Sequence, residues 1–154
     1  MWKTSARKSN PLPQGSILMN IIIDSNVLFS ALIKDSLTRK LILDYDGTFL
    51  FPSYIFEEYE KHKKELIKKT GMEDADIQKL INLILKKVFI VPNEILDSYR
   101  EEALNVIGKI DPDDVLFIAC ALAYENSIIW SDDKKLKNQT RVKVLNTSEI
   151  IKII

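Results

Sequence analysis

Five short runs rich in apolar residues place the strongest constraint on how this chain can fold. The runs lie at residues 20–23, 48–51, 88–91, 127–130 and 142–145. Longer segments separate them, and apolar residues recur there at helical spacing, most clearly at 74–87. Short apolar strands that alternate with amphipathic helices form a parallel sheet covered on both faces. We therefore expect an α/β domain of three layers around a central parallel sheet of about five strands.

Polar and turn-forming residues mark the expected helix boundaries. The helices are expected at 25–33, at 37–43, after Pro52-Ser53 to about Lys69, at 74–87, 95–106, 112–125, and from about Ser148 onward. Ser25 or Asn26 is available to cap the first helix, because such side chains accept hydrogen bonds from the free N–H groups of a helix start. Thr147 or Ser148 is available to cap the last.

The first 18 residues differ in composition from the rest of the chain. They contain basic, Pro, Ser and Gly residues but no apolar core, so they do not have the pattern of a secretory signal. Met19 directly precedes the first expected strand and would make a natural start. We expect residues 1–18 to be a flexible leader of expression-vector origin and residues 19–154 to form a single domain.

The chain carries no net charge, with 22 Lys and Arg against 22 Asp and Glu. It therefore has no overall attraction to nucleic acid, but two stretches are locally basic. Residues 61–69 carry five Lys and one Glu, and residues 134–143 carry five cations and no acid. Beside an acidic pocket, such stretches could hold a phosphate backbone. The alternative explanation is that both basic stretches are ordinary charged surfaces exposed to solvent.

The single cysteine and the single histidine exclude several classes of site. Cys120 allows no disulfide framework and no cysteine-based zinc site, and its apolar neighbours predict a core position. His62 alone cannot supply paired-histidine chemistry, and we expect it at the surface. No apolar run reaches the length of a membrane span. We expect a cytoplasmic protein without a membrane partner.

Acidic residues lie at or just beyond the ends of four expected strands. They are Asp24, Glu57 and Glu58, Asp111, Asp113 and Asp114, and Asp132 and Asp133. Ligands of open α/β sheets bind beyond the carboxyl ends of the strands. Carboxylates gathered there repel one another unless a cation holds them, and oxygen-only ligation suits Mg²⁺ or Mn²⁺. The pattern predicts a divalent cation site.

Each acidic cluster also has a structural explanation. Asp24 could cap the helix that follows it, and the acids at 57 and 58 could complement the dipole of their helix. One acid among 111–114 is expected as an N-cap. A turn with a capped short helix accounts for one of Asp132 and Asp133. These alternatives leave open which acid of each cluster would bind the cation.

Four segments, in chain order, resemble those of PIN-domain nucleases. Residues 24–28 (DSNVL) are similar to the family's opening D-T/S-N-V-L, and Glu58-Tyr59 to its Glu followed by an apolar residue. Residues 111–114 (DPDD), with small residues at 119–122, resemble its D-x-x-D helix. Residues 131–136 (SDDKKL) resemble its T/S-x-D-K-x-L. The resemblance covers residues 20 to about 146.

The resemblance implies a site, position by position. The implied catalytic metal ligands are Asp24, Glu58, Asp114 and Asp133, with Asp111 as an additional acid. The family spacing selects Asp133 over Asp132 and Glu58 over its neighbour. Asn26 and Ser131 resemble residues that support the ligands, and Ser131 keeps the hydroxyl of the family's Thr.

The function implied by the resemblance is that of a Mg²⁺- or Mn²⁺-dependent endoribonuclease that acts on single-stranded RNA. The implied fold is the three-layer α/β/α Rossmann-like PIN fold. Small members are often toxins of toxin–antitoxin pairs, so a small antitoxin and a homodimer are expected partners. Lys61, Lys64, Lys134 and Lys135 are the expected RNA-binding cations. The rival is an inactive PIN-like scaffold that binds RNA or protein. A phosphatase would require a second Asp at the first strand, and residues 24–26 lack it.

Overall fold

The computed structural model describes residues 19–33, 37–108 and 112–154, apart from the side chains of Ile55, Phe56, Glu58, Pro112 and Asp113. Its strands are β1 (Asn20–Ile23), β2 (Thr48–Pro52), β3 (Val88–Val91), β4 (Ser127–Trp130) and β5 (Val144–Leu145). Its helices are α1 (Ser25–Ile33), α2 (Leu37–Asp44), α3 (Ile55–Thr70), α4 (Asp74–Leu85), α5 (Asn93–Ile107), α6 (Pro112–Ala123), the 3₁₀ helix η1 (Lys134–Asn138) and α7 (Thr147–Ile151). The expected leader and Asp111 lie outside the described residues.

The five strands form one parallel sheet in the order β3-β2-β1-β4-β5. The prediction of a five-stranded parallel sheet is confirmed. The chain moves outward from β1 through β2 to β3, and then crosses to β4 and β5 on the other side of β1. The strand order therefore reverses between β1 and β4, which is where open α/β sheets bind their ligands.

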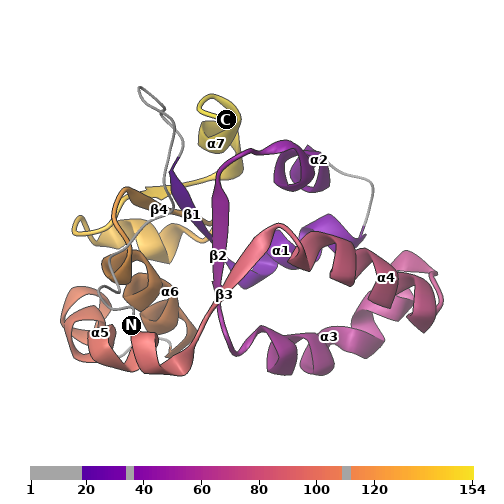
Figure 1. Ribbon diagram of the computed structural model, residues 1–154, viewed down its shortest axis with the longest axis horizontal. Helices are drawn as coiled ribbons and strands as arrows, with labels where there is room; N and C mark the ends of the chain where they lie inside the picture. Colours follow the sequence, from indigo (N-terminus) through magenta and orange to yellow (C-terminus); the bar gives the residue numbers. More distant parts are fainter. Residues whose placement is uncertain (1–18, 34–36, 109–111) are drawn as a thin grey trace.

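Helices cover both faces of the sheet, as Figure 1 shows. On one face α5 packs against α6, and α6 packs against β1, β2 and β4. On the other face α1 contacts α2, α3 and α4. The three-layer arrangement is thus confirmed, and it explains why every strand is apolar beyond its first residue.

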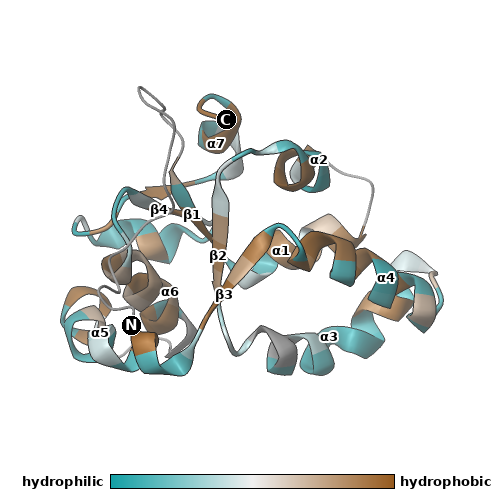
Figure 2. Ribbon diagram, in the orientation of Figure 1, coloured by the Kyte–Doolittle hydropathy of each residue, from teal (hydrophilic) through white to brown (hydrophobic). Residues whose placement is uncertain are grey.

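The central strand forms the middle of the core. Ile21, Ile22 and Ile23 are fully buried, because each lies between a strand on either side and a helix layer above or below. Figure 2 shows apolar residues along β1 and on the helices that cover it. Cys120 is buried in α6, as predicted, and burial raises the pKa of its thiol. None of the helices in the described ranges is long and apolar enough to cross a membrane.

Two element boundaries differ from the predicted ones because side chains take over backbone partners. β5 begins at Val144 rather than 142, since the amide of Gln139 binds both the N–H and the carbonyl of Val142 (2.9 and 2.8 Å). Asn146 caps α7 in a capping box with Glu149, so the expectation of Thr147 or Ser148 as cap is wrong. α4 and α6 end two residues before their predicted ends, and α5 begins two residues early.

Candidate metal centre at the carboxyl end of the sheet

Asp24 follows the central strand and lies where the strand order reverses. Its N–H donates to the carbonyl of Trp130 at the end of β4 (3.0 Å), and its own carbonyl accepts the N–H of Leu28 (3.0 Å). Asp24 therefore occupies the N-cap of α1. The expectation that Ser25 or Asn26 would cap this helix is wrong, because both lie within its first turn. The candidate ligand and the cap are the same residue.

The carboxylate of Asp24 is buried, with 8 % of the residue exposed. Burial is the main cause that raises the pKa of this carboxyl above its ordinary 3.8, and the charge of Asp133 raises it further. Hydrogen bonds from the Ser131 hydroxyl and from the backbone N–H groups of Asn26 and Ser25 act in the opposite direction. Because the net pKa is raised, the ionised form is disfavoured, and a cation beside Asp24 would stabilise it.

Ser131 joins Asp24 to a second acid of the predicted set. Its hydroxyl donates to Oδ2 of Asp24 across 2.5 Å and accepts the backbone N–H of Asp133 across 3.0 Å. Ser131 is 1 % exposed, whereas the side chain of Asp133 is 30 % exposed. Ser131 thus fixes the buried carboxylate and the start of the loop that carries the more accessible one.

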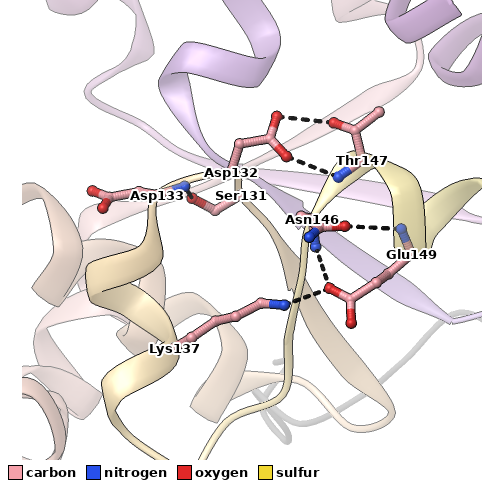
Figure 3. Close-up of polar contacts among 7 residues, drawn as sticks. All are labelled: Ser131, Asp132, Asp133, Lys137, Asn146, Thr147 and Glu149. Atoms are coloured by element: carbon pink, nitrogen blue, oxygen red, sulfur yellow. Dashed lines mark hydrogen bonds and ion pairs between the residues drawn. The ribbon is translucent and has the colours of Figure 1, made fainter.

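The two neighbouring acids after β4 make different contacts. Oδ1 of Asp133 accepts the N–H of Lys135 (3.0 Å) and so caps η1. The carboxylate of Asp132 instead accepts the N–H and the hydroxyl of Thr147, each across 2.9 Å. Figure 3 shows the two carboxylates pointing in different directions. Asp133 is the one whose charge acts on Asp24.

Asp114 lies in the first turn of α6 and is 6 % exposed. Phe117, three residues later, packs edge-on against Phe51 near the end of β2, with 5.8 Å between ring centroids. Because β2 lies beside β1 in the sheet, this contact brings the start of α6 to the same sheet edge as Asp24.

Other predicted ligands lie outside the described side chains. Glu58 is part of α3, but its side chain is not among those described, and neither are Asp111 and the side chain of Asp113. The neighbouring Glu57 is exposed. Among the side chains that are described, no three Asp, Glu, His or Cys groups lie close enough to hold a metal ion. The convergence of all four predicted acids stays a prediction.

Tyr54 is a neighbour of the site that the sequence analysis missed. It lies between β2 and α3, and its hydroxyl is 3.2 Å from Oγ of Ser25, the residue after Asp24. Its ring stacks on Phe51, with centroids 5.8 Å apart. The sequence signal was an aromatic residue just beyond a strand end, which is equally typical of core packing.

The predicted supporting amide and the histidine lie toward the surface. Asn26 is exposed, and its contact with Asp24 is made by its backbone N–H rather than by its side-chain amide. His62 lies against the ring of Phe29, with centroids 5.2 Å apart, and its side chain is 38 % exposed. The placement agrees with the expected surface position of His62.

The four lysines predicted to bind RNA are exposed. Lys134 and Lys135 begin η1, directly after Asp133, and Nζ of Lys135 is 3.9 Å from the Asp133 carboxylate. Lys61 and Lys64 lie along α3, which starts at the carboxyl end of β2. Both pairs of lysines therefore lie on helices that begin at the edge of the sheet where Asp24 lies.

A family model for the PIN domain matches residues 22–151. The chain belongs to the PIN-domain family. Members of this family are typically nucleases. The solved structure of VapBC2 from Rickettsia felis bound to a DNA fragment from their promoter is similar, with a TM-score of 0.59 and 16 % sequence identity, covering 83 % of this chain and 98 % of that one. At that identity the likeness concerns the fold. No curated protein matches the chain.

The donor set of this PIN domain fits a divalent cation. Asp133 is close enough to Asp24 for its charge to raise the pKa of the Asp24 carboxyl. The Ser131 hydroxyl contacts both residues, through the carboxylate of Asp24 and the backbone N–H of Asp133. These are oxygen donors without sulfur or imidazole, which is the chemistry that suits Mg²⁺ or Mn²⁺.

Asp24→Asn replaces the buried carboxylate by a neutral side chain of nearly the same shape. The variant should separate the free-energy cost of ionising the carboxylate from the stabilisation that a bound metal ion provides. Since the pKa of Asp24 is raised, the stability conferred by its protonated form is present at low pH and is lost as the pH rises through the folded-state pKa. Metal-free Asp24→Asn should therefore melt above the wild type at neutral pH, by on the order of 2–4 °C, the shift for ~1 kcal/mol in a domain of this size. The difference should shrink on acidification.

Adding Mn²⁺ should raise the melting temperature of the wild type but not that of Asp24→Asn. Asp97→Asn is the matched control, because Asp97 is exposed and pairs with Arg100 (3.0 Å) in α5. Equal stabilisation of the wild type and Asp24→Asn by Mn²⁺, measured by calorimetry, would rule out Asp24 as a ligand.

Proposed function

We propose that this PIN domain is a metal-dependent endoribonuclease that hydrolyses phosphodiester bonds of single-stranded RNA, with Mg²⁺ or Mn²⁺ as its cofactor. The observation that carries the proposal is the buried Asp24 carboxylate at the reversal of the sheet, coupled through Ser131 to Asp133. A buried acid with a raised pKa and an acidic neighbour is typical of a functional site. The choice of single-stranded RNA rests on the family resemblance.

Four carboxylates would hold the cation, and the protein's own contacts would keep them in place. The proposed ligands are Asp24, Glu58, Asp114 and Asp133, with Asp111 available to a second ion. When bound, the cation would neutralise charge on the phosphoryl oxygens and activate water for hydrolysis. Ser131 orients Asp24 by holding Oδ2, and the cap of η1 holds Asp133 through Oδ1.

The exposed lysines would position the RNA backbone. Lys134 and Lys135 lie directly after the candidate site, and Lys61 and Lys64 lie on the helix that carries Glu58. Cations on the borders of an acidic centre attract phosphates while leaving the centre to the metal. RNA binding should therefore weaken as the salt concentration rises.

The alternative is an inactive scaffold that binds RNA or protein through the same fold. A scaffold would gain nothing from ionising a buried carboxylate beside another acid, which lowers stability at neutral pH. The proposal explains why both acids are present at this position.

Cleavage of a single-stranded RNA oligonucleotide tests the proposal. The wild type should cut it in Mn²⁺ or Mg²⁺ and should stop when EDTA is added. Asp114→Asn should lower the rate by about two orders of magnitude or more, the scale expected when a major electrostatic contribution is removed. The exposed Asp97→Asn and the surface His62→Ala should each leave the rate nearly unchanged. The assays require matched salt, because the lysines respond to ionic strength.

Two results would contradict this assignment in different ways. Absence of cleavage with either metal, together with retained RNA binding, would favour the scaffold. Equal losses of rate in Asp114→Asn and His62→Ala would show that the histidine takes part in the reaction. They would also show that the Asp114 carboxylate contributes no more to the rate than the histidine does.

We also propose that the chain is the toxin of a toxin–antitoxin pair and that a small antitoxin binds between α1, α3 and α4. These helices enclose a cavity of about 210 Å³. Its walls are apolar and its rim is polar, with the lining Leu28, Phe29, Leu32, Tyr59, Glu60, Gln78, Ile81, Asn82, Ile84 and Leu85. The Tyr59 hydroxyl is buried there, and no residue of the described part hydrogen-bonds it. An amphipathic segment of a partner could fill such a groove. The likeness to VapBC2 supports the role.

Two leucines of α4 provide a matched test of this surface. Leu85 lines the groove, whereas Leu83 is 46 % exposed and does not. Leu85→Glu should abolish co-purification with the product of a small neighbouring reading frame, because it places a charge among apolar walls, and Leu83→Glu should retain it. Loss of partner binding in Leu83→Glu alone would contradict the assignment. Loss of self-association in Leu85→Glu, seen by sedimentation, would instead assign the groove to the expected homodimer.

A further inference from the structure

Asp132 and Thr147 form a polar link that the proposed cation site does not use. Thr147 begins α7, and its N–H and hydroxyl donate to Oδ1 and Oδ2 of Asp132, each across 2.9 Å. The same hydroxyl accepts the indole N–H of Trp130 across 3.0 Å. Each oxygen of the carboxylate has a partner, and the hydroxyl both donates and accepts. The direction of the threonine side chain is therefore fixed from two sides.

The link lies within the loop that carries two residues of the candidate site. Asp132 separates Ser131 from Asp133 in the sequence, and its carboxylate points toward α7 while that of Asp133 points elsewhere (Figure 3). The N–H of Ser131 donates to the carbonyl of Leu145, just before α7 (3.0 Å). A residue held by its side chain in the middle of a three-residue loop restricts the backbone on both sides of it.

A second contact ties the far side of the loop to the same helix. Nζ of Lys137 in η1 contacts Oε1 of Glu149 in α7 at 2.5 Å, and Glu149 is the partner of Asn146 in the capping box. Asp132 thus attaches the loop between β4 and η1 to α7. Lys137 attaches η1, which follows this loop, to the same helix. Figure 3 shows both attachments converging on the first turn of α7.

We propose that Asp132 and Thr147 are positioning residues, which fix the 131–133 loop to α7 and so set how Ser131 and Asp133 face Asp24. The inference rests on the proposed function for its consequence, which is metal binding at that site. The physical reason is that the hydrogen bonds from Ser131 to Asp24 and from Asp133 to Ser131 depend on the backbone of the loop. Without the link, the loop gains conformations in which these two bonds are not made together.

Removing only the threonine hydroxyl tests the link. Thr147→Val should speed hydrogen exchange at the Asp133 amide, which donates to Ser131. It should also weaken Mn²⁺ binding by about tenfold, the scale for residues that orient metal ligands, and lower kcat with little change in KM. Thr147→Ser keeps the hydroxyl and should restore all three measurements. Asp132→Ala should reproduce the defect, and the double variant should be no worse than the more affected single one.

Thr70→Val is the matched control. The Thr70 hydroxyl also makes two hydrogen bonds, to the carbonyl of Leu66 (2.7 Å) and from the N–H of Met72 (3.1 Å), at the far end of α3. It should lower the melting temperature without changing Mn²⁺ affinity, kcat or Asp133 exchange. If Thr147→Val behaves like this control, the link is merely structural and the inference is overturned.

The proposed function and the positioning role can fail separately. A wild type that neither binds Mn²⁺ nor cleaves RNA would refute the proposed function. In that case, faster exchange at the Asp133 amide in Thr147→Val would still support the positioning of the loop, and unchanged exchange would overturn it.

Discussion

The burial of a carboxylate at the reversal of the sheet is the constraint on which the account depends. Asp24 directly follows the buried central strand, and only 8 % of the residue is exposed. The fold compensates with donors from two directions: the first turn of α1, and Ser131 at the end of the neighbouring strand. These contacts join β1, β4 and α1 at one point. They lower the pKa of the carboxyl only in part, so a net cost of ionisation remains.

The acids after β4 show that a structural contact does not exclude a residue from the candidate site. Each acid after β4 has its own structural partner: Asp133 caps η1, and Asp132 anchors the loop to α7. Capping and ligation are compatible, because a carboxylate has two oxygens and a cap occupies one of them. The choice between cap and ligand, which the sequence left open for each cluster, is therefore not exclusive. Asp24 itself is an N-cap, and among the candidate ligands whose side chains are described only Asp114 is more buried.

The strand positions could be predicted because burial on both faces leaves a continuous apolar run. β1, β3 and β4 have the predicted bounds, and the PIN-domain family was recognised from motif order. Some boundary predictions failed where a side chain replaced a backbone partner, as Gln139 does at Val142. The end of α6 is a similar case: Asn126 has a left-handed φ of 52°, and the Ser127 hydroxyl binds the carbonyl of Tyr124.

The site was less predictable than the fold for a related reason. Residue types and spacing identified acids at one edge of the sheet, but they carry no information on side-chain direction. The bond from Ser131 to Asp24 spans 107 positions, and the contact of Tyr54 with Ser25 spans 29. The first pair depends on the pairing of β1 with β4, and the second on where the segment after β2 lies relative to the start of α1. Asp132 and Asp133 have the same chemistry and differ only in which way the loop turns them.

Anomalous diffraction from crystals grown with Mn²⁺ locates the bound ion without relying on activity. We expect a manganese peak bonded to carboxylate oxygens of Asp24 and Asp114, at the carboxyl end of β1, with Ser131 still donating to Asp24. A peak elsewhere on the protein, or no peak beside Asp24 at saturating Mn²⁺, would contradict it.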